Sequence, residues 1–273
     1  MFGQTAPHRD WTKIIAMNNP LSIALLHGWA TEPTIWDSVV SELESRGHSV
    51  TVYEMPGYGS RRSENGNVSF DQLVSDATDQ LDGCELWVGW SIGAMVAIGS
   101  ALKKSTQCKA MMAVCPTAKF CCDAEKETAL KQLRDSVATD PIKSVTRFRR
   151  SMASAENRRT IGKKISEMHS LGAGNKNNVT VETLLAGLEI LSTTDLMEEV
   201  NKIGISVRIL SGEEDTIIPC SSGEKLHHLI PNSTYTTLPC GHVPFLECPQ
   251  RFMEQLFEFA QTIVETAASS KPV

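Results

Sequence analysis

The chain has 273 residues, of which 41% are hydrophobic and 21% are charged, and its formal net charge is -6. This length can form one large α/β domain or two small ones, and the composition is that of an ordinary globular protein. The acidic balance argues against a dedicated nucleic-acid-binding protein, and no apolar run approaches the ~20 residues that a helix needs to cross a bilayer.

The first residues, MFGQTAPHRDWTKII, lack the basic-then-apolar order of a secretion signal. We therefore expect a cytoplasmic protein. The eight cysteines show no C-x-x-C spacing of the metal-binding type. In a reducing compartment we expect them to be mostly small, buried residues.

Short apolar runs alternate with longer amphipathic ones along much of the chain. The predicted strands are 21–26, 49–54, 85–90, 109–115, 206–211 and 234–238. The predicted helices between and after them are 34–46, 69–82, 92–104, 219–230 and 249–266. This alternation predicts βαβ units and a mostly parallel sheet covered by helices on both faces.

The alternation stops between Cys115 and about Asp195. There the pattern predicts helices only, at 123–137, 141–153, 157–170 and 180–193. Such an insert either caps the carboxyl edge of the sheet or adds a packing layer. We divide the chain into a core of residues 1–116 and 196–273 and a helical cap of residues 117–195.

A candidate nucleophile lies between a predicted strand and a predicted helix. Residues 89–93 read Gly-Trp-Ser-Ile-Gly, a G-x-S-x-G motif. A serine on so sharp a strand-to-helix turn has a strained backbone, and flanking glycines let other segments pass close by. The context predicts that the Ser91 hydroxyl is exposed at the carboxyl end of the sheet.

A serine nucleophile needs a base, and the base needs an acid that orients it. After the predicted strand 206–211 comes GEEDTIIP, which places Asp215 just before an apolar turn. Glu213 and Glu214 compete for the role of the acid, but they precede the turn and we expect them to face solvent. Asp215 is therefore the predicted acid.

The base is predicted in the same way. After the predicted strand 234–238 comes PCGHVPF, with His242 at the strand's carboxyl end. His227 and His228 lie in the middle of a predicted helix and are expected on the surface. The order Ser91, Asp215, His242 places all three groups on one rim of the sheet.

The tetrahedral intermediate of acyl transfer also needs oxyanion donors. One is the backbone N–H of Ile92, directly after the nucleophile. The segment His27-Gly28-Trp29 ends the first predicted strand, and we expect Gly28 to turn the backbone inward so that the Trp29 N–H is the second donor. His27 is expected to brace this loop by hydrogen bonds.

These motifs together resemble the α/β-hydrolase family across nearly the whole chain. HGW, MPGYGSR at 55–61, GWSIG, GEED and GHVPF run in that family's order. VGWSIGAMVA and the downstream GLEILSTTDL at 187–196 are similar to the pimeloyl-[acyl-carrier protein] methyl ester esterases of biotin synthesis, the BioH type. The second segment lies outside the catalytic motifs and is therefore the more specific of the two.

The resemblance implies an α/β-hydrolase fold with a helical cap and a catalytic triad of Ser91, Asp215 and His242. It implies that Trp29 and Ile92 are the oxyanion donors. It also implies that Trp90 and Phe148, together with Trp29, line the channel that binds the acyl chain.

The segment 141–164 holds eight Lys or Arg residues and one acidic residue in an otherwise acidic chain. Lys143 and Arg147 are spaced i,i+4, as are Arg159 and Lys163, so each pair shares one helical face. A basic rim of this kind would steer and dock a small acidic acyl-carrier protein, and the resemblance implies that these four positions contact it. The alternative is a charged helical face that improves solubility.

The other basic residues of the segment are expected to contribute to docking or to be solvated: Arg149, Arg150, Arg158 and Lys164. Its apolar residues are expected mostly to pack on the sheet layer. Phe148 is the exception, because it sits between basic positions at the predicted mouth of the channel.

The resulting hypothesis is a serine carboxylesterase that hydrolyses the methyl ester of pimeloyl-acyl-carrier protein to the free carboxylate and methanol. We expect a monomer that needs no metal or organic cofactor and has no nucleic-acid or membrane partner. Three alternatives remain: a broad short-chain carboxylesterase, a relative that performs elimination with the same triad, and a hydrolase-like receptor that signals through its cap.

Overall fold

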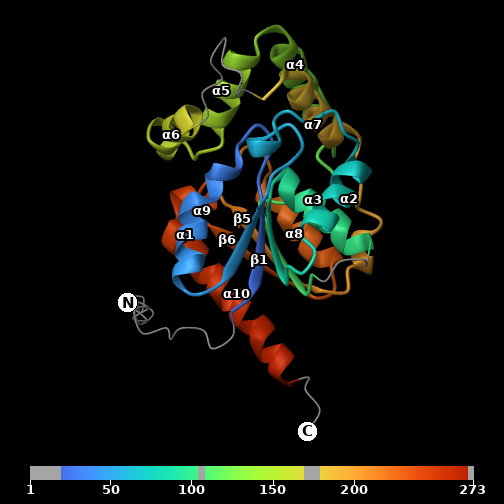
Figure 1. Ribbon diagram of the computed structural model, residues 1–273. Helices are drawn as coiled ribbons and strands as arrows, with labels where there is room; N and C mark the ends of the chain where they lie inside the picture. The colour runs from blue at the N-terminus through green and yellow to red at the C-terminus, as the bar shows by residue number, and fades with distance from the viewer. Residues whose placement is uncertain (1–19, 104–107, 169–178, 270–273) are drawn as a thin grey trace, which may run out of the picture.

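A six-stranded, fully parallel sheet forms the centre of the protein in the computed structural model, which describes residues 20–103, 108–168 and 179–269 (Figure 1). The strand order is β2-β1-β3-β4-β5-β6. The strands are β1 (Ser22–Leu26), β2 (Ser49–Tyr53), β3 (Leu86–Trp90), β4 (Ala110–Val114), β5 (Ser206–Gly212) and β6 (Ser233–Leu238). Every residue of the central strands β3 and β4 is buried, as expected for parallel strands covered on both faces.

Helices cover both faces of the sheet (Figure 1). One face carries α1 (Asp37–Ser45), α9 (Pro244–Glu247) and α10 (Pro249–Ser269), and the other carries α2 (Phe70–Gln80), α3 (Ile92–Lys103) and α8 (Cys220–Leu229). The apolar core is accordingly split into two clusters of buried side chains. The predicted core elements are confirmed to within a few residues, except that residue 104 of the predicted helix 92–104 lies outside the described residues.

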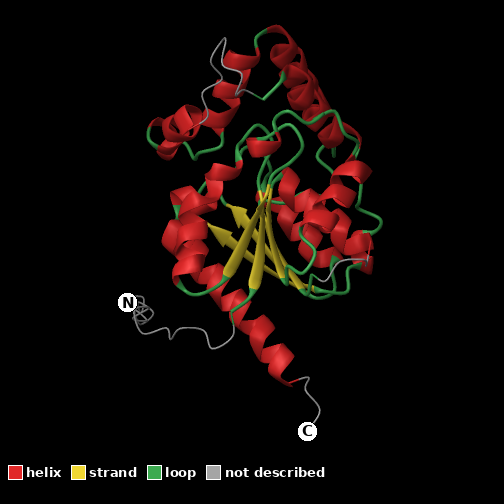
Figure 2. Cartoon of the chain, viewed as in Figure 1, coloured by secondary structure: helices red, strands yellow, loops and turns green. Residues whose placement is uncertain are grey.

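Between β4 and β5 the described residues form helices and no strand. They are α4 (Ala124–Thr139), α5 (Pro141–Ser151), the 3-10 turn η4 (Asn157–Arg159), α6 (Ile161–Met168) and α7 (Val181–Thr193). These helices gather beyond one end of the sheet (Figure 2). The last two residues of the predicted helix 157–170 lie outside the described residues.

The start of α5 is fixed by its own sequence. The Asp140 carboxylate accepts a hydrogen bond of 3.1 Å from the N–H of Lys143, and Pro141 occupies the first helical position. Both features favour helix initiation at this residue. The residue at which α5 begins is therefore set locally.

None of the eight cysteines forms a disulfide; four are buried, three lie at intermediate depth and one is exposed. In the described part of the chain, no helix has the length and apolar character required to cross a membrane.

Candidate active site

Ser91 occupies a strained turn between β3 and α3. Its φ angle is +58°, a left-handed conformation that costs a non-glycine residue roughly 1–2 kcal/mol. A Cβ at Gly89 would lie 2.5 Å from the carbonyl oxygen of Gly93, and a Cβ at Gly93 would lie 2.4 Å from the carbonyl oxygen of Leu26. The two glycines of the motif therefore permit close backbone approach, as predicted.

Asp215 and His242 form a buried hydrogen-bonded pair. The distance from His242 Nδ1 to Asp215 Oδ2 is 2.6 Å, and both side chains are almost completely inaccessible to solvent. The other carboxylate oxygen accepts hydrogen bonds of 2.8 and 2.9 Å from the N–H groups of Ile217 and Ile218. Because a carboxylate only accepts, Nδ1 carries the imidazole proton and Nε2 is left as the proton acceptor.

The competing acids lie elsewhere. Glu213 and Glu214 are exposed, whereas Asp215 is buried, as expected from their order before the turn. His228 is exposed, and His227 is half-buried with its Nδ1 2.9 Å from the Ser233 hydroxyl.

Trp90 connects the turn of the nucleophile to the histidine. Its indole Nε1–H donates a hydrogen bond of 2.6 Å to the carbonyl oxygen of His242, and its ring packs edge-on against Phe245. The side chain has no exposed surface. Trp90 is not among the residues that line the cavity beside Trp29 and Ile92, and its position supports the loop that carries His242.

Residues 28–31, which include the predicted oxyanion donor Trp29 and which we call the oxyanion loop, follow the carboxyl end of β1. The left-handed residue in this loop is Ala30, with a φ angle of +57°, and not Gly28. Gly28 is required for a different reason, since a Cβ there would lie 2.8 Å from the Trp90 ring. In the described residues, neither the Trp29 N–H nor the Ile92 N–H has a protein acceptor, so both donors are available to an oxyanion.

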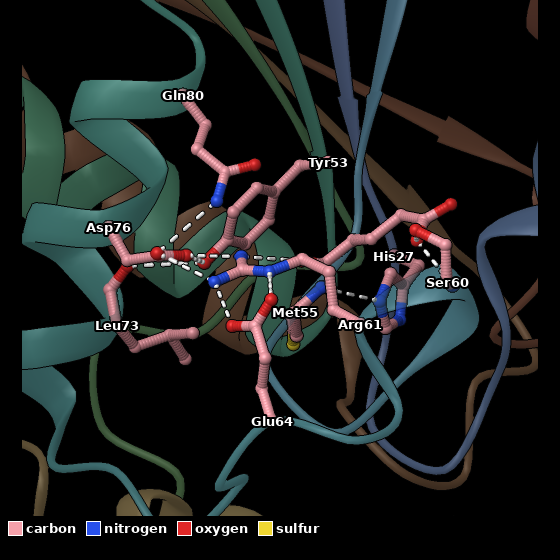
Figure 3. Close-up of polar contacts among 10 residues, drawn as sticks. His27, Tyr53, Met55, Ser60, Arg61, Glu64, Leu73, Asp76 and Gln80 are labelled. Carbon is pink, nitrogen blue, oxygen red and sulfur yellow. Dashed lines mark hydrogen bonds and ion pairs between the residues drawn. The ribbon is translucent and has the colours of Figure 1, made fainter.

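His27 braces this loop, as expected. Its Nε2 accepts a hydrogen bond of 3.4 Å from the Met55 N–H (Figure 3). Its Nδ1 lies 3.0 Å from the carbonyl oxygen of Gly28. These partners require an Nδ1–H tautomer. Complete burial lowers the pKa of His27 to about 4, against smaller opposing effects of Gly28 and Glu54, so the ring is neutral near pH 7.

An ionic network stabilises the next loop, which contains the MPGYGSR motif. Arg61 donates to both carboxylate oxygens of Asp76 and also to Glu64, and the Tyr53 hydroxyl donates to Asp76 over 2.5 Å (Figure 3). Burial alone would raise the pKa of Asp76, but the bonds from Arg61 and Tyr53 outweigh it and the pKa is lowered. This motif therefore organises the loop beside His27 and lies outside the acid–base pair.

The expected substrate-facing aromatic residues Trp29 and Phe148 pack together. Their ring centroids are 4.8 Å apart in an edge-to-face arrangement, and the Trp29 indole N–H donates to the Leu184 carbonyl oxygen of α7 over 2.9 Å. Trp29 and Ile92 line a cavity of about 20 Å³ that extends toward Tyr58 and Thr183. Both residues predicted to supply oxyanion donors thus line this small cavity beside α7.

The four basic residues expected at the rim are all exposed. Two of them, Lys143 and Arg147, border a surface hollow of about 490 Å³ together with Arg150 and Arg158, and no acidic residue lines it. Arg159 and Lys163 are not among its lining residues, and the Lys163 ammonium lies 3.7 Å from Glu167.

One described group of side chains has the donor atoms of a metal site. The Cys115 thiol lies within 4.8 Å of the ligand atoms of Asp215 and His242, and all three residues are buried. The Asp215 carboxylate and His242 Nδ1 already bond to each other. Burial and the Asp215 charge raise the pKa of Cys115 far above its usual value, so the thiol is protonated and is a poor metal ligand.

Sequence reasoning treated Arg149 as an exposed basic residue, but the structure buries it, with 2% of its surface exposed. Its Nε donates a hydrogen bond of 2.7 Å to the Ala30 carbonyl oxygen in the oxyanion loop. A signal was present in the sequence: Arg149 is four residues after the buried Val145 and three before the buried Met152. Helical periodicity thus puts it on the apolar face of α5.

Comparison with known proteins agrees with this geometry. Residues 23–255 match the model of the alpha/beta hydrolase family. The pimeloyl-[acyl-carrier protein] methyl ester esterase of Nitrosomonas europaea is 30% identical over 243 residues, which cover 86% of this chain and 94% of that protein. The esterase of the same name from Vibrio cholerae is 27% identical, over 87% of this chain and 93% of that protein.

Solved structures share the fold at low sequence identity. An esterase from Exiguobacterium antarcticum superposes with a TM-score of 0.77 at 18% identity, covering 88% of this chain and 92% of that one. A bromoperoxidase from Bacillus anthracis gives a TM-score of 0.77 at 19% identity, covering 89% and 92%.

Proposed function

Because this chain belongs to the alpha/beta hydrolase family and is a carboxylic ester hydrolase, we propose that it cleaves methyl pimeloyl-acyl-carrier protein with Ser91, Asp215 and His242 as its catalytic triad. The observation that carries the catalytic part is the buried 2.6 Å bond between His242 and Asp215. An imidazole whose Nδ1–H donates to a carboxylate presents Nε2 as the base for a serine.

The reaction runs through an acyl-enzyme. His242 takes the proton of Ser91 as the serine oxygen attacks the ester carbonyl, and the N–H groups of Trp29 and Ile92 stabilise the oxyanion. His242 then protonates the departing methanol and activates a water that releases the acid. Asp215 orients the ring and stabilises its charged form.

The choice of substrate is supported by the curated relatives, whose names specify a pimeloyl-acyl-carrier-protein methyl ester. The basic hollow of Lys143, Arg147, Arg150 and Arg158 is consistent with it, since a strongly acidic carrier would be attracted to such a surface. Arg159 and Lys163 extend the positive surface outside the hollow, and we include them in the proposed docking face.

The test compares three esters: methyl pimeloyl-acyl-carrier protein, free monomethyl pimelate and p-nitrophenyl butyrate. We expect the carrier-bound ester to have the highest kcat/KM, and Ser91→Ala to lower the rate on all three by a factor of about 10⁴ or more. Equal kcat/KM for carrier-bound and free methyl esters would indicate a broad carboxylesterase. Full activity of Ser91→Ala would refute the triad, and very slow turnover of all three esters would favour the receptor hypothesis.

A further inference from the structure

The oxyanion loop is held at three successive peptide groups. The carbonyl oxygen of Gly28, in the same peptide as the Trp29 N–H, accepts from the Thr31 hydroxyl over 2.8 Å and lies 3.0 Å from His27 Nδ1. The next peptide is held by the Ala30 N–H, which donates to the Tyr58 hydroxyl over 3.4 Å. The partners of the first two groups thus come from the loop itself, through Thr31, and from the core of the protein, through His27 and Tyr58.

The third peptide group is held from the cap. The Ala30 carbonyl oxygen accepts the 2.7 Å hydrogen bond from Arg149 Nε, and Arg149 belongs to α5. Since Ala30 has a left-handed backbone that is unfavourable for an alanine, the loop needs external partners to keep this conformation.

Arg149 is an unusual residue for such a contact. Its neighbours Arg147 and Arg150 are exposed, whereas Arg149 is buried, and removing a guanidinium from water is unfavourable unless it is well bonded. Burial lowers the pKa of Arg149 to about 10, with Tyr58 and Glu32 opposing the change, so the group stays charged near neutral pH. Its bond to the Ala30 carbonyl is therefore charge-assisted and stronger than a neutral one.

Helix α5 and its C-cap residue Met152 reach both halves of the site. Phe148 packs on Trp29, and the carbonyl oxygen of Met152 accepts a hydrogen bond of 2.7 Å from the backbone N–H of His242. Arg149 lies on α5 between Phe148 and Met152. A side chain at this position can act on the oxyanion loop without touching the acid–base pair.

We propose that Arg149 is a positioning residue of the oxyanion hole: from the cap it fixes the Ala30 carbonyl and so keeps the Trp29 N–H directed at the developing oxyanion. This rests on the proposed function, in which Trp29 is an oxyanion donor. The contact makes a seated cap a requirement for transition-state stabilisation, beyond any role of the cap in binding the acyl chain.

The test uses Arg149→Met, which keeps most of the side-chain length and removes the donor. We expect kcat for p-nitrophenyl butyrate to fall about tenfold or more while KM changes by less than about twofold, since a displaced donor weakens only transition-state binding. Affinity for an aryl trifluoromethyl ketone, which forms an anionic hemiketal with the serine, should fall by the same factor as kcat. Arg251→Met, the same substitution at an exposed position on α10, is the matched control and should change neither quantity.

A purely structural Arg149 would give a different pattern. Arg149→Met would then unfold at a lower temperature yet keep kcat and inhibitor affinity within about twofold of the wild type. That result, or a rise in KM at constant kcat, overturns the proposal. If Arg149→Met does not fold, Arg149→Lys is used instead. Lysine retains the positive charge but has no Nε–H at the position that bonds to the Ala30 carbonyl oxygen. A kcat and an inhibitor affinity equal to those of the wild type would then refute the role.

Failure of the proposed function is distinguishable from failure of this inference. Ser91→Ala reports on the nucleophile alone, so an active Ser91→Ala variant would remove the esterase mechanism whatever Arg149 does. An inactive Ser91→Ala with a fully active Arg149→Met would leave the esterase intact and refute the positioning role only.

Discussion

The backbone N–H of His242 donates a hydrogen bond of 2.7 Å to the carbonyl oxygen of Met152, just beyond the end of α5. The candidate base on the sheet's rim is thereby bonded directly to the cap segment. The two chain segments also approach closely at the preceding residue, where Gly241 faces Met152 and Ser154.

Gly241→Ala should disturb this junction. A Cβ at Gly241 would lie 2.6 Å from both the Met152 carbonyl oxygen and the Ser154 nitrogen, and backbone atoms cannot move aside as a flexible side chain can. We expect kcat for p-nitrophenyl butyrate to fall about 100-fold, because a small displacement of a catalytic base has a large effect on rate. Steady-state kinetics on the purified variant measures this.

Gly204→Ala is the matched control. A Cβ at Gly204 meets no atom within 4 Å, so the same substitution there should leave kcat unchanged. Wild-type kcat in Gly241→Ala would mean that the contact between cap and base has no catalytic consequence.

Trp90→Phe should test whether Trp90 supports His242 or lines a channel. The substitution removes the buried indole donor to the His242 carbonyl oxygen, and we expect the free energy of unfolding to fall by about 1–3 kcal/mol. The kcat should fall for esters of every acyl length alike. A change confined to long acyl chains would instead identify Trp90 as a channel residue.

Trp36→Phe provides the comparison. Trp36 is also fully buried and packs edge-on against Trp90 with centroids 6.4 Å apart, but its indole N–H has no hydrogen-bond partner among the described residues. Both substitutions replace an indole by the smaller phenyl ring. A loss of activity seen with Trp90→Phe and not with Trp36→Phe therefore isolates the hydrogen bond to His242.

Much of this architecture could be predicted because the signals are local. Buried parallel strands give short apolar runs, and the G-x-S-x-G turn needs its glycines for reasons confined to a few residues. The acid was identified from its place at the end of a strand, and the structure buries Asp215 while Glu213 and Glu214 remain exposed. These predictions used chain order and not the packing of distant segments.

The contacts between cap and core could not be predicted in this way. The bond from Arg149 to Ala30 joins residues 119 positions apart, and the bond from Trp90 to His242 joins residues 152 apart. A basic residue on an apolar helical face has no partner that the sequence identifies, so Arg149 was grouped with the exposed arginines. The sequence likewise predicted that Gly28 turns the backbone, because it does not show that the Trp90 ring packs against Gly28.

His27 should make stability depend on pH. Its pKa is about 4 in the folded protein against 6.5 unfolded, so between these values the unfolded chain binds more protons and the free energy of unfolding rises with pH. This shift contributes roughly 3 kcal/mol to the free energy of unfolding. The contribution is fully present above pH 6.5 and is lost as the pH falls toward 4. Urea unfolding from pH 4.5 to 7.5 should show a shallower slope for His27→Asn.

Some slope should persist in His27→Asn, because burial and Arg46 also lower the pKa of His48. The exposed His228 is the control position, and His228→Asn should leave the slope as in the wild type. Identical slopes for His27→Asn and wild type would contradict the neutral, buried state of His27.

Asp76→Asn should weaken the loop organised by Arg61. The variant loses the carboxylate that accepts hydrogen bonds from Arg61 and Tyr53. We therefore expect the free energy of unfolding at pH 7 to fall by about 1–3 kcal/mol. Since the pKa of Asp76 is lowered in the folded protein, its contribution is present above the unfolded pKa and is lost as the pH falls through the folded pKa. The exposed Asp79 on the same helix is the control, and an equal effect of Asp79→Asn would contradict a specific role for Asp76.

Reversal of charge at the hollow should affect the carrier-bound ester alone. Lys143→Glu with Arg147→Glu changes two lining residues that face no described acidic partner, and we expect KM for methyl pimeloyl-acyl-carrier protein to rise about tenfold. Arg159→Glu with Lys163→Glu should have a smaller effect, because both residues lie outside the hollow and Lys163 is already near Glu167.

The control for net charge is a double reversal at exposed lysines on other helices, Lys131→Glu with Lys225→Glu. This control variant changes the total charge by the same amount as Lys143→Glu with Arg147→Glu. If the hollow is a docking site, the control should change KM little; if only long-range attraction matters, both double variants should raise KM equally. The difference between the two double variants should shrink as salt is raised, because exposed charges are screened. Rates on p-nitrophenyl butyrate separate docking from damage to the cap: if they fall together with those on the carrier-bound ester, α5 has been displaced and the hollow is not a docking site.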